Sequence, residues 1–215
     1  MSEHRVNIVR GLAVVVWLLS AVGCSSVQQE QADKRWQDAD FTIELNQYPQ
    51  SDYNQVEAQF TTEQPLQLVF RVVSDLELTT QWFDYLDDIE TLEMYSNNQF
   101  LIRSVINSPW PLTNREIITC VDTYFSPKTI RIQVTACPKR YPINGQYVRV
   151  TEAKSTWTLQ QLDSGRVLVN YQAWLDPNGN IPTLFYNSQL IDSTTSSLHQ
   201  LITLIETSSL DQYAY

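Results

Sequence analysis

Two segments near the start of the folded region alternate apolar and polar residues. They cover residues 41–45 and 56–60, and turn-forming residues at 49–52 separate them. A period of two places successive side chains on opposite faces of a strand, so both segments are predicted to be half-buried strands.

Two short helical stretches follow. Thr62 is predicted to cap the first helix, whose apolar face carries Leu66, Val69 and Val73. The second stretch, residues 78–86, carries Trp82 and Phe83. Both are too short to form a core of their own, and we expect them to pack on a sheet.

The middle of the chain is predicted to be one antiparallel meander, because turn-forming residues recur about every ten positions. Its strands are predicted over residues 90–95, 100–107, 115–125, 129–136, 147–162 and 167–175. A long amphipathic helix over residues 182–208 closes the chain, with one apolar stripe of Ile191, Leu198, Ile202 and Ile205. The pattern therefore predicts an α+β fold in which one long helix covers the concave face of a curved antiparallel sheet and leaves a central hydrophobic cavity.

The first 24 residues have the features of an export signal. Arg5 and Arg10 precede a short apolar run over residues 12–19, and small residues lead to Cys24. The run is too short to cross about 30 Å of hydrocarbon. The small residues before Cys24 resemble a bacterial lipobox, which predicts a lipid, such as palmitate, on Cys24. An ordinary signal peptide that contains a cysteine is the alternative.

This start divides the chain into three parts. Residues 1–24 are predicted to be a lipoprotein signal peptide, residues 25–38 a polar tether, and residues 39–210 the folded domain. Ser25 resembles the residue that follows the cysteine in lipoproteins of the outer membrane. We therefore expect an exported protein anchored to a membrane that faces the periplasm, the outer rather than the inner one.

Composition and charge narrow the class of partner. The chain is 43% hydrophobic and 18% charged, which suits a folded globular domain, and its formal net charge is −10. An acidic surface repels phosphate backbones, so we expect no nucleic-acid partner. It also repels anionic lipid surfaces, so attachment to a membrane requires the lipid anchor.

Three motifs in the second half of the chain identify a family resemblance. They are the segment 109–111 (Pro-Trp-Pro) with Arg115 and Glu116 downstream, the segment 145–149, and the segment 176–182 with Asn187 after it. In this order and spacing they resemble START (StAR-related lipid-transfer) domains. The resemblance implies a helix-grip fold whose apolar cavity, closed by the C-terminal helix and neighbouring loops, carries a lipid or another hydrophobic molecule. We expect a monomer without a cofactor or a metal.

Ten residues are candidates for contact with that ligand: Trp82, Phe83, Arg103, Trp110, Trp157, Tyr171, Trp174, Ile191, Leu198 and Ile202. The aromatic members are equally compatible with simple core packing. Arg103 interrupts an apolar strand, and inside the cavity it would require a carboxylate or a ligand head group. In the alternative arrangement Arg103 points outward, on the same side as Leu101 and Val105.

Other polar residues have structural interpretations. Arg115 and Glu116 are adjacent in a strand and face opposite ways, so their expected role is to hold the loop around Trp110. Asp176 begins a predicted turn rather than a calcium loop. A hairpin centred on residues 126–127 places Cys120 opposite Gln133, four residues from Cys137, which argues against a disulfide. A bulge that closes part of this gap would allow one, so the disulfide stays open as the alternative for an exported chain.

The sequence favours a carrier over an enzyme. It shows none of the nucleophile-elbow, phosphate-loop or dinucleotide motifs, and its two histidines are His4, in the signal, and His199, beside the apolar stripe of the last helix. No catalytic residue is predicted. Two alternatives stay open. One is a helix-grip cyclase or hydrolase that uses Tyr171 and Arg103, and the other is an envelope scaffold with a collapsed cavity.

Overall fold

One curved sheet organises the part of the chain that the computed structural model describes, which is residues 34–38, 40–109 and 111–213. Cys24 and Trp110 lie outside the described residues. The sheet has ten strands. They are β1 (Lys34–Gln37), β2 (Phe41–Gln47), β3 (Asn54–Thr62), β4 (Leu86–Ser96), β5 (Gln99–Ile106), β6 (Arg115–Ser126), β7 (Thr129–Ala136), β8 (Val148–Val150), β9 (Ala153–Gln161) and β10 (Val167–Leu175).

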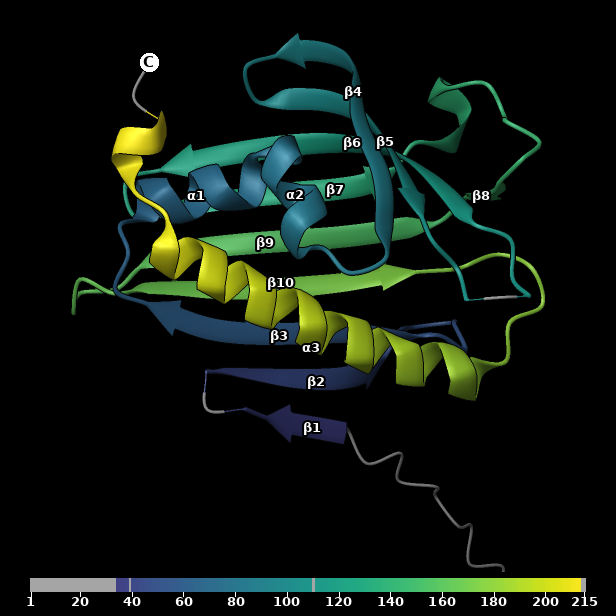
Figure 1. Ribbon diagram of the computed structural model, residues 1–215, viewed down its shortest axis with the longest axis horizontal. Helices are drawn as coiled ribbons and strands as arrows, with labels where there is room; N and C mark the ends of the chain where they lie inside the picture. The colour runs from purple at the N-terminus through teal and green to yellow at the C-terminus, as the bar shows by residue number, and fades with distance from the viewer. Residues whose placement is uncertain (1–33, 39, 110, 214–215) are drawn as a thin grey trace, which may run out of the picture. The chain divides into compact units, whose positions relative to one another are not determined.

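The strand order is β1-β2-β3-β10-β9-β7-β6-β5-β4, and every neighbouring pair along it is antiparallel. β8 lies off this path and pairs in parallel with the first three residues of β6. The α+β class and the curved antiparallel sheet predicted from the sequence are confirmed (Figure 1).

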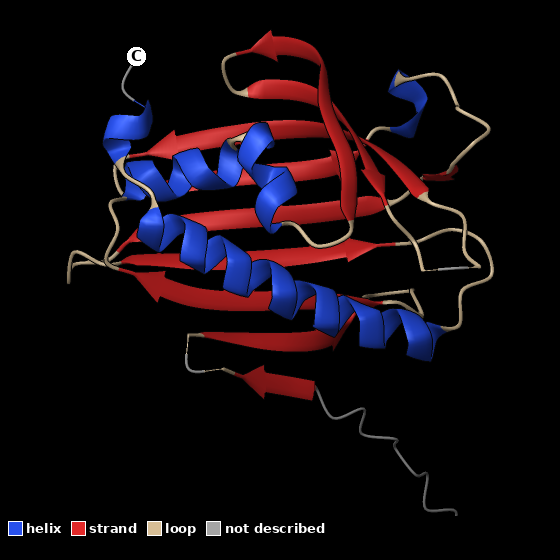
Figure 2. Cartoon of the chain, viewed as in Figure 1, coloured by secondary structure: helices blue, strands red, loops and turns tan. Residues whose placement is uncertain are grey.

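The helices lie on one face of the sheet (Figure 2). They are α1 (Leu66–Ser74), α2 (Leu76–Trp82) and α3 (Thr183–Thr207), with two short 3-10 helices, η1 (Pro138–Arg140) and η2 (Leu210–Tyr213), beyond them. α3 crosses β3 and β10 diagonally (Figure 1). It packs against α1, α2, β2 and β3, so its contacts favour one half of the sheet.

Local chemistry explains the two short helices. α1 buries five apolar side chains, from Leu66 to Val73. Asp75 separates it from α2 and caps α2, because its carboxylate accepts hydrogen bonds from the backbone N–H of Glu77 (2.9 Å) and Leu78 (3.3 Å).

The predicted helix cap at Thr62 is wrong. α1 begins only after Pro65, whose fixed φ suits a helix start, and Thr62 is the last residue of β3. The Thr62 hydroxyl instead accepts a hydrogen bond from the backbone N–H of Gln64 (3.0 Å) and donates one to Glu206 (2.5 Å). It therefore ties the end of β3 to α3.

Two predicted segments have different boundaries in the structure. The predicted strand over residues 147–162 is two strands, because β8 pairs with β6 whereas β9 pairs with β7 and β10. Residues 34–37, predicted to belong to the tether, form β1 and pair with β2. The folded domain therefore begins by Lys34 rather than at residue 39.

Cys120 and Cys137 form a disulfide with a Cα–Cα distance of 5.8 Å, contrary to the hairpin argument. The turn lies one residue later than predicted, since Ser126 pairs with Thr129. A shift of one residue in the turn moves every opposite residue by two, so Cys120 faces Thr135. The backbone N–H of Cys137 then donates to the carbonyl of Ile118 (2.7 Å), which holds the two cysteines together.

Candidate functional site

The concave face of the sheet and the helices enclose a cavity of about 730 Å³. Alternate residues of β6 line one wall: Arg115, Ile117, Thr119, Val121 and Thr123. The same alternation on β5 adds Ile102, Ser104 and Ile106. The described lining is mainly apolar, with scattered hydroxyls, which is the composition of a site for a hydrophobic small molecule.

Aromatic rings form a continuous wall on another side of the cavity. The Tyr171 ring of β10 stacks on the Trp157 ring of β9, with centroids 4.2 Å apart and planes 29° apart. Trp157 meets Trp82 edge to face at 5.8 Å, and Trp82 meets Phe83 at 5.6 Å. All four rings line the cavity, so this wall offers a large, stiff apolar surface.

The structure brings six of the ten predicted ligand contacts together at the cavity: Trp82, Phe83, Trp157, Tyr171, Trp174 and Leu198. Trp110 lies outside the described residues. Ile191 and Ile202 are not among the described lining residues. They pack, partly buried, against the core formed by β2, β3 and the helices.

The face that α3 turns to the cavity is not its most apolar one. The described lining from α3 is Phe185, Tyr186, Gln189, Leu190, Ser193, Thr194, Ser197 and Leu198. The most apolar stripe packs on the sheet, where Leu201 and Ile205 are fully buried. Sequence reasoning missed this mixed stripe because it took the apolar stripe for the cavity face.

Arg103 does not line the cavity among the described residues, which corrects its place among the ligand contacts. Its strand neighbours Ile102 and Ser104 do line it, and a period of two turns Arg103 to the opposite face with Leu101 and Val105. The alternative weighed from the sequence is thus the correct one, yet Arg103 is only 9% exposed there.

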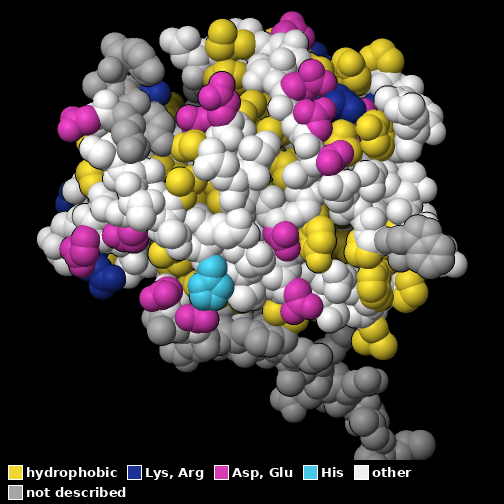
Figure 3. All heavy atoms as spheres, viewed as in Figure 1, with side chains coloured by type: hydrophobic (Ala, Val, Ile, Leu, Met, Phe, Trp, Pro, Cys, Tyr) yellow, Lys and Arg dark blue, Asp and Glu magenta, His cyan; other side chains and the backbone are white. Residues whose placement is uncertain are grey.

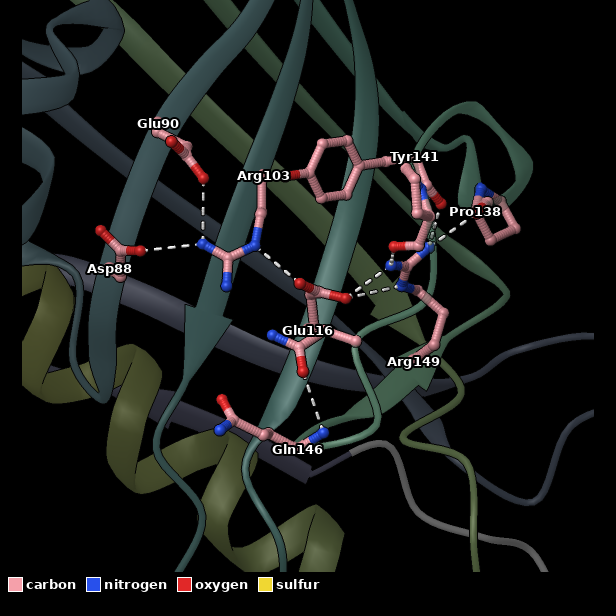
Figure 4. Close-up of polar contacts among 10 residues, drawn as sticks. Asp88, Glu90, Arg103, Glu116, Pro138, Tyr141, Gln146 and Arg149 are labelled. Atoms are coloured by element: carbon pink, nitrogen blue, oxygen red, sulfur yellow. Dashed lines mark hydrogen bonds and ion pairs between the residues drawn. The ribbon is translucent and has the colours of Figure 1, made fainter.

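On that opposite face Arg103 belongs to an ionic network centred on Glu116 (Figure 4). Glu116 is fully buried. One carboxylate oxygen accepts a hydrogen bond from Arg103 Nε (2.6 Å), and the other accepts from Arg149 through Nε (3.0 Å) and a terminal nitrogen (2.5 Å). The hydrogen bond to Glu116 is the main cause that raises the pKa of Arg103, so this guanidinium stays charged.

The network joins four strands and a loop. Arg103 of β5 also contacts Asp88 (2.9 Å) and Glu90 (3.1 Å) of β4. Arg149 of β8 donates to the carbonyls of Pro138, Tyr141 and Pro142 (2.7–3.0 Å). Glu116 lies on β6 between them, so one buried carboxylate fixes the strands whose other face lines the cavity.

Arg115 points the other way, as predicted, and joins two loops at one end of the cavity. Its guanidinium donates to the Ser108 hydroxyl (3.2 Å) and the Thr113 carbonyl (2.5 Å) on one side, and to the carbonyls of Pro177 and Asn178 (both 3.2 Å) on the other. Burial lowers its pKa. These contacts confirm that Arg115 holds the loop on both sides of residue 110. The same role predicted for Glu116 is wrong, because its carboxylate bonds to Arg103 and Arg149 instead.

The segment that begins at Asp176 is a turn. The Asp176 carboxylate accepts a hydrogen bond from the backbone N–H of Asn178 (2.8 Å), and the Asn178 side-chain oxygen accepts one from the backbone N–H of Thr151 (2.9 Å). Asn178 and Gly179 both have positive φ, 51° and 80°, which suits these two residue types. Within the described residues no group of metal-ligating side chains is present.

Exposed lining residues mark a mouth of the cavity near the start of α3. Tyr85, Pro109 and Phe185 line the cavity and are exposed. Hydrophobic side chains gather on the surface around this end of α3 (Figure 3), where Leu184 is 86% exposed. Tyr85, which lies just before β4, connects the loop after β5 to α3. Its carbonyl accepts a hydrogen bond from the N–H of Asn107 (2.8 Å), and its hydroxyl contacts Gln189 of α3 (3.4 Å).

Comparison with solved structures identifies proteins of similar fold. A solved STAR-related lipid transfer protein from Xanthomonas axonopodis matches with a TM-score of 0.72 at 22% identity, over 81% of this chain and 99% of that chain. Human StAR-related lipid transfer protein 5 matches at 0.71 and 14% identity, over 83% and 88%. The Zhui aromatase/cyclase of a Streptomyces species matches at 0.50 and 15% identity, over 71% and 93%.

Sequence comparison finds a relative that aligns with only part of this chain. No protein-family model matches the chain. Uncharacterized protein PA1579 of Pseudomonas aeruginosa is 31% identical over 99 residues, which are 46% of this chain and 49% of that protein. The match therefore spans about half the length of the relative. The similarity to the solved structures establishes the fold: the chain has the helix-grip fold of START domains.

The buried network generates a stability prediction. Glu116→Gln keeps the side chain's size but leaves two guanidinium groups without their shared carboxylate, so the free energy of unfolding should fall by about 3–5 kcal/mol. Urea unfolding followed by circular dichroism measures it. Glu152→Gln, at an exposed position, is the matched control and should change stability by less than about 0.5 kcal/mol. A Glu116→Gln variant as stable as the control would contradict a central role for the network.

Proposed function

We propose that this protein binds one hydrophobic molecule of the lipid class in its cavity and carries it within the bacterial cell envelope. The single observation that carries the proposal is the cavity itself. Its volume of about 730 Å³ lies within the range of about 300–1,000 Å³ that ligand sites occupy. Burial of each methylene contributes about 0.8 kcal/mol, so an acyl chain or a ring system gains useful affinity without a charged partner.

The proposed contacts are the six predicted residues at the cavity wall, with the mixed face of α3 opposite them. Two neighbours of similar fold are named as lipid transfer proteins, which supports a carrier. A neighbour named as an aromatase/cyclase keeps an enzyme of the cyclase or hydrolase type as the alternative. The open volume argues against the scaffold alternative, which requires a cavity filled by side chains.

Filling the cavity should remove the ligand without unfolding the protein. Ser104 lines the wall of β5, so Ser104→Trp places an indole in the space that the ligand needs. We expect the full-length chain bearing Cys24→Ser to take up about one lipid per protein from a bacterial extract, and the further change Ser104→Trp to reduce uptake by more than about tenfold.

The control is Gln160→Trp, at an exposed position of β9 outside the described lining. It should load as the parent does. Bound lipid is extracted and quantified by mass spectrometry, and urea midpoints verify folding. Equal loading of the two tryptophan variants would contradict binding in the cavity, and recovery of a chemically altered lipid would favour the enzyme alternative.

The proposed gate is the N-terminal part of α3 with the loop that begins at Ser108. This part of the helix carries cavity-lining residues, and Tyr85 connects it to the loop at the mouth. Leu184 and Phe185 are exposed there. Opening would break the hydrogen bonds of Tyr186 to the Leu175 carbonyl, of Asn187 to the Asn54 N–H and of Gln189 to Tyr85. Opening at this end admits a ligand, and closure buries it.

Cross-linking the gate should stop uptake. Tyr85→Cys and Gln189→Cys, joined by a short bis-maleimide, fix α3 to the mouth, and we expect the rate of lipid uptake to fall by more than about tenfold. Each single-cysteine variant, treated with the same reagent, should load at the parent rate. Undiminished loading of the cross-linked double variant would rule out this gate.

A lipid on Cys24 is proposed to anchor the chain to the membrane that faces the periplasm, the outer rather than the inner one. No helix among the described residues is long and apolar enough to cross a membrane. An anchor holds the carrier close to a donor membrane and raises its local concentration there. Cys24→Ser should move the protein from the pelleted membranes to the soluble fraction, whereas Ser25→Ala should leave it in the pellet. Retention of the Cys24→Ser variant in the pellet would contradict the anchor.

A further inference from the structure

The Tyr171 hydroxyl lies at the wall of an apolar cavity and has no hydrogen-bond partner within the part of the chain that the structure describes. Tyr171 lines the cavity from the middle of β10. Its ring is fixed by the stack on Trp157 at 4.2 Å, and Trp157 is 7% exposed. No other described residue forms a hydrogen bond with the Tyr171 hydroxyl, although enclosed polar groups in proteins are normally hydrogen-bonded.

The hydroxyl remains within reach of a ligand. Among the described residues, the side-chain atoms that are inaccessible and make no hydrogen bond are Trp82 Nε1 and Arg166 Nε, the latter ion-paired with Glu63. The Tyr171 oxygen is not one of them, so it retains accessible surface. Since Tyr171 lines the cavity, that surface faces internal space, and burial raises the pKa of its phenol. An unpartnered hydroxyl that faces internal space is a ready site for a ligand oxygen.

Tyr186 supplies a second oxygen in the same region. It projects into the cavity from the first turn of α3, and its hydroxyl donates to the carbonyl of Leu175 (3.3 Å). Since its one proton is used there, the Tyr186 oxygen can only accept. Leu175 lies on β10 four residues after Tyr171, and both tyrosines line the cavity, so the two phenols approach the same part of it. Burial chiefly raises the pKa of Tyr186.

We propose that the Tyr171 and Tyr186 hydroxyls bind the single hydroxyl group of a neutral hydrophobic alcohol. The ligand oxygen accepts a hydrogen bond from the Tyr171 hydroxyl, and the ligand hydroxyl donates one to the Tyr186 oxygen. A hydrocarbon satisfies neither group. A carboxylate would lose its hydration there without gaining a cationic partner from either phenol. This inference rests on the proposed function, and it narrows the cargo from hydrophobic molecules in general to alcohols with an apolar body.

Three fluorescent probes that share one ring system and one chain test the proposal: 1-pyrenebutanol, 1-butylpyrene and 1-pyrenebutyrate. Each is titrated into the delipidated full-length chain bearing Cys24→Ser, and tryptophan quenching gives the Kd. We compare the butanol-to-butyl ratio of Kd values between proteins, because this comparison cancels the different affinities of the probes for water.

Tyr171→Phe should shift this ratio against the alcohol by about 2- to 10-fold, the effect of one neutral hydrogen bond, while the affinity for 1-butylpyrene stays within about twofold. Its melting temperature without ligand should not fall, because the hydroxyl has no partner to lose. Tyr124→Phe removes a phenol that is 54% exposed on β6 and should leave the ratio unchanged.

An unchanged ratio in Tyr171→Phe, with all probes still bound, would overturn the alcohol site and leave the carrier function intact. Tightest binding of 1-pyrenebutyrate by the parent protein would also overturn it, in favour of a cationic contact such as Arg115 at the cavity end. Failure of the folded parent to bind any of the three probes would reject the carrier function, and the alcohol site with it.

Discussion

A straight helix can lie against only part of a strongly curved sheet, and this constraint determines the structure. α3 has 25 residues and spans roughly 38 Å. It packs against α1, α2, β2 and β3, where Leu201 and Ile205 of its apolar stripe are fully buried. The concave surface of β5 and β6 lies beyond the reach of that stripe. The space between these two strands and α3 is the cavity, which the fold leaves open although protein cores are otherwise closely packed.

A wall that is not packed from inside needs support from outside. The buried Glu116 provides it, since it joins β6 to Arg103 on β5 and Arg149 on β8, and Arg103 continues to β4. Two charged groups in a protein interior are not strongly stabilising by themselves. Here the charged groups fix the positions of the strands, because the hydrogen bonds of two guanidinium groups hold one carboxylate in a single arrangement. The disulfide from β6 to Cys137 closes the same region of the sheet.

How much of this was predictable depends on the range of each interaction. The strand over residues 129–136 and the strand over 167–175 follow from local alternation between turns, and the structure has the same bounds. The side of Arg103 depends on Glu116, 13 residues away on another strand, which periodicity alone does not identify. The prediction about the disulfide depended on which two residues form the hairpin turn, and it failed because that turn was placed one residue too early.

The candidate site was also predicted only in part. Aromatic residues were a good guide to the wall, because bulky rings at alternate strand positions must face either the core or the cavity. The cavity face of α3 was missed, because hydroxyls such as those of Ser193, Thr194 and Ser197 look like surface residues in a sequence. Two of these three bond to carbonyls of their own helix, at 3.3 Å and 2.6 Å, and so lie at an apolar cavity without an unmet hydrogen bond.

The central claim is that the cavity holds one apolar molecule, and native mass spectrometry of the full-length chain bearing Cys24→Ser, purified from its own cells without detergent, tests it most directly. We predict one discrete added mass in a one-to-one complex, lost on mild activation in the gas phase, with the mass of a neutral lipid. A bare protein that also remains bare after incubation with a total lipid extract would contradict the claim.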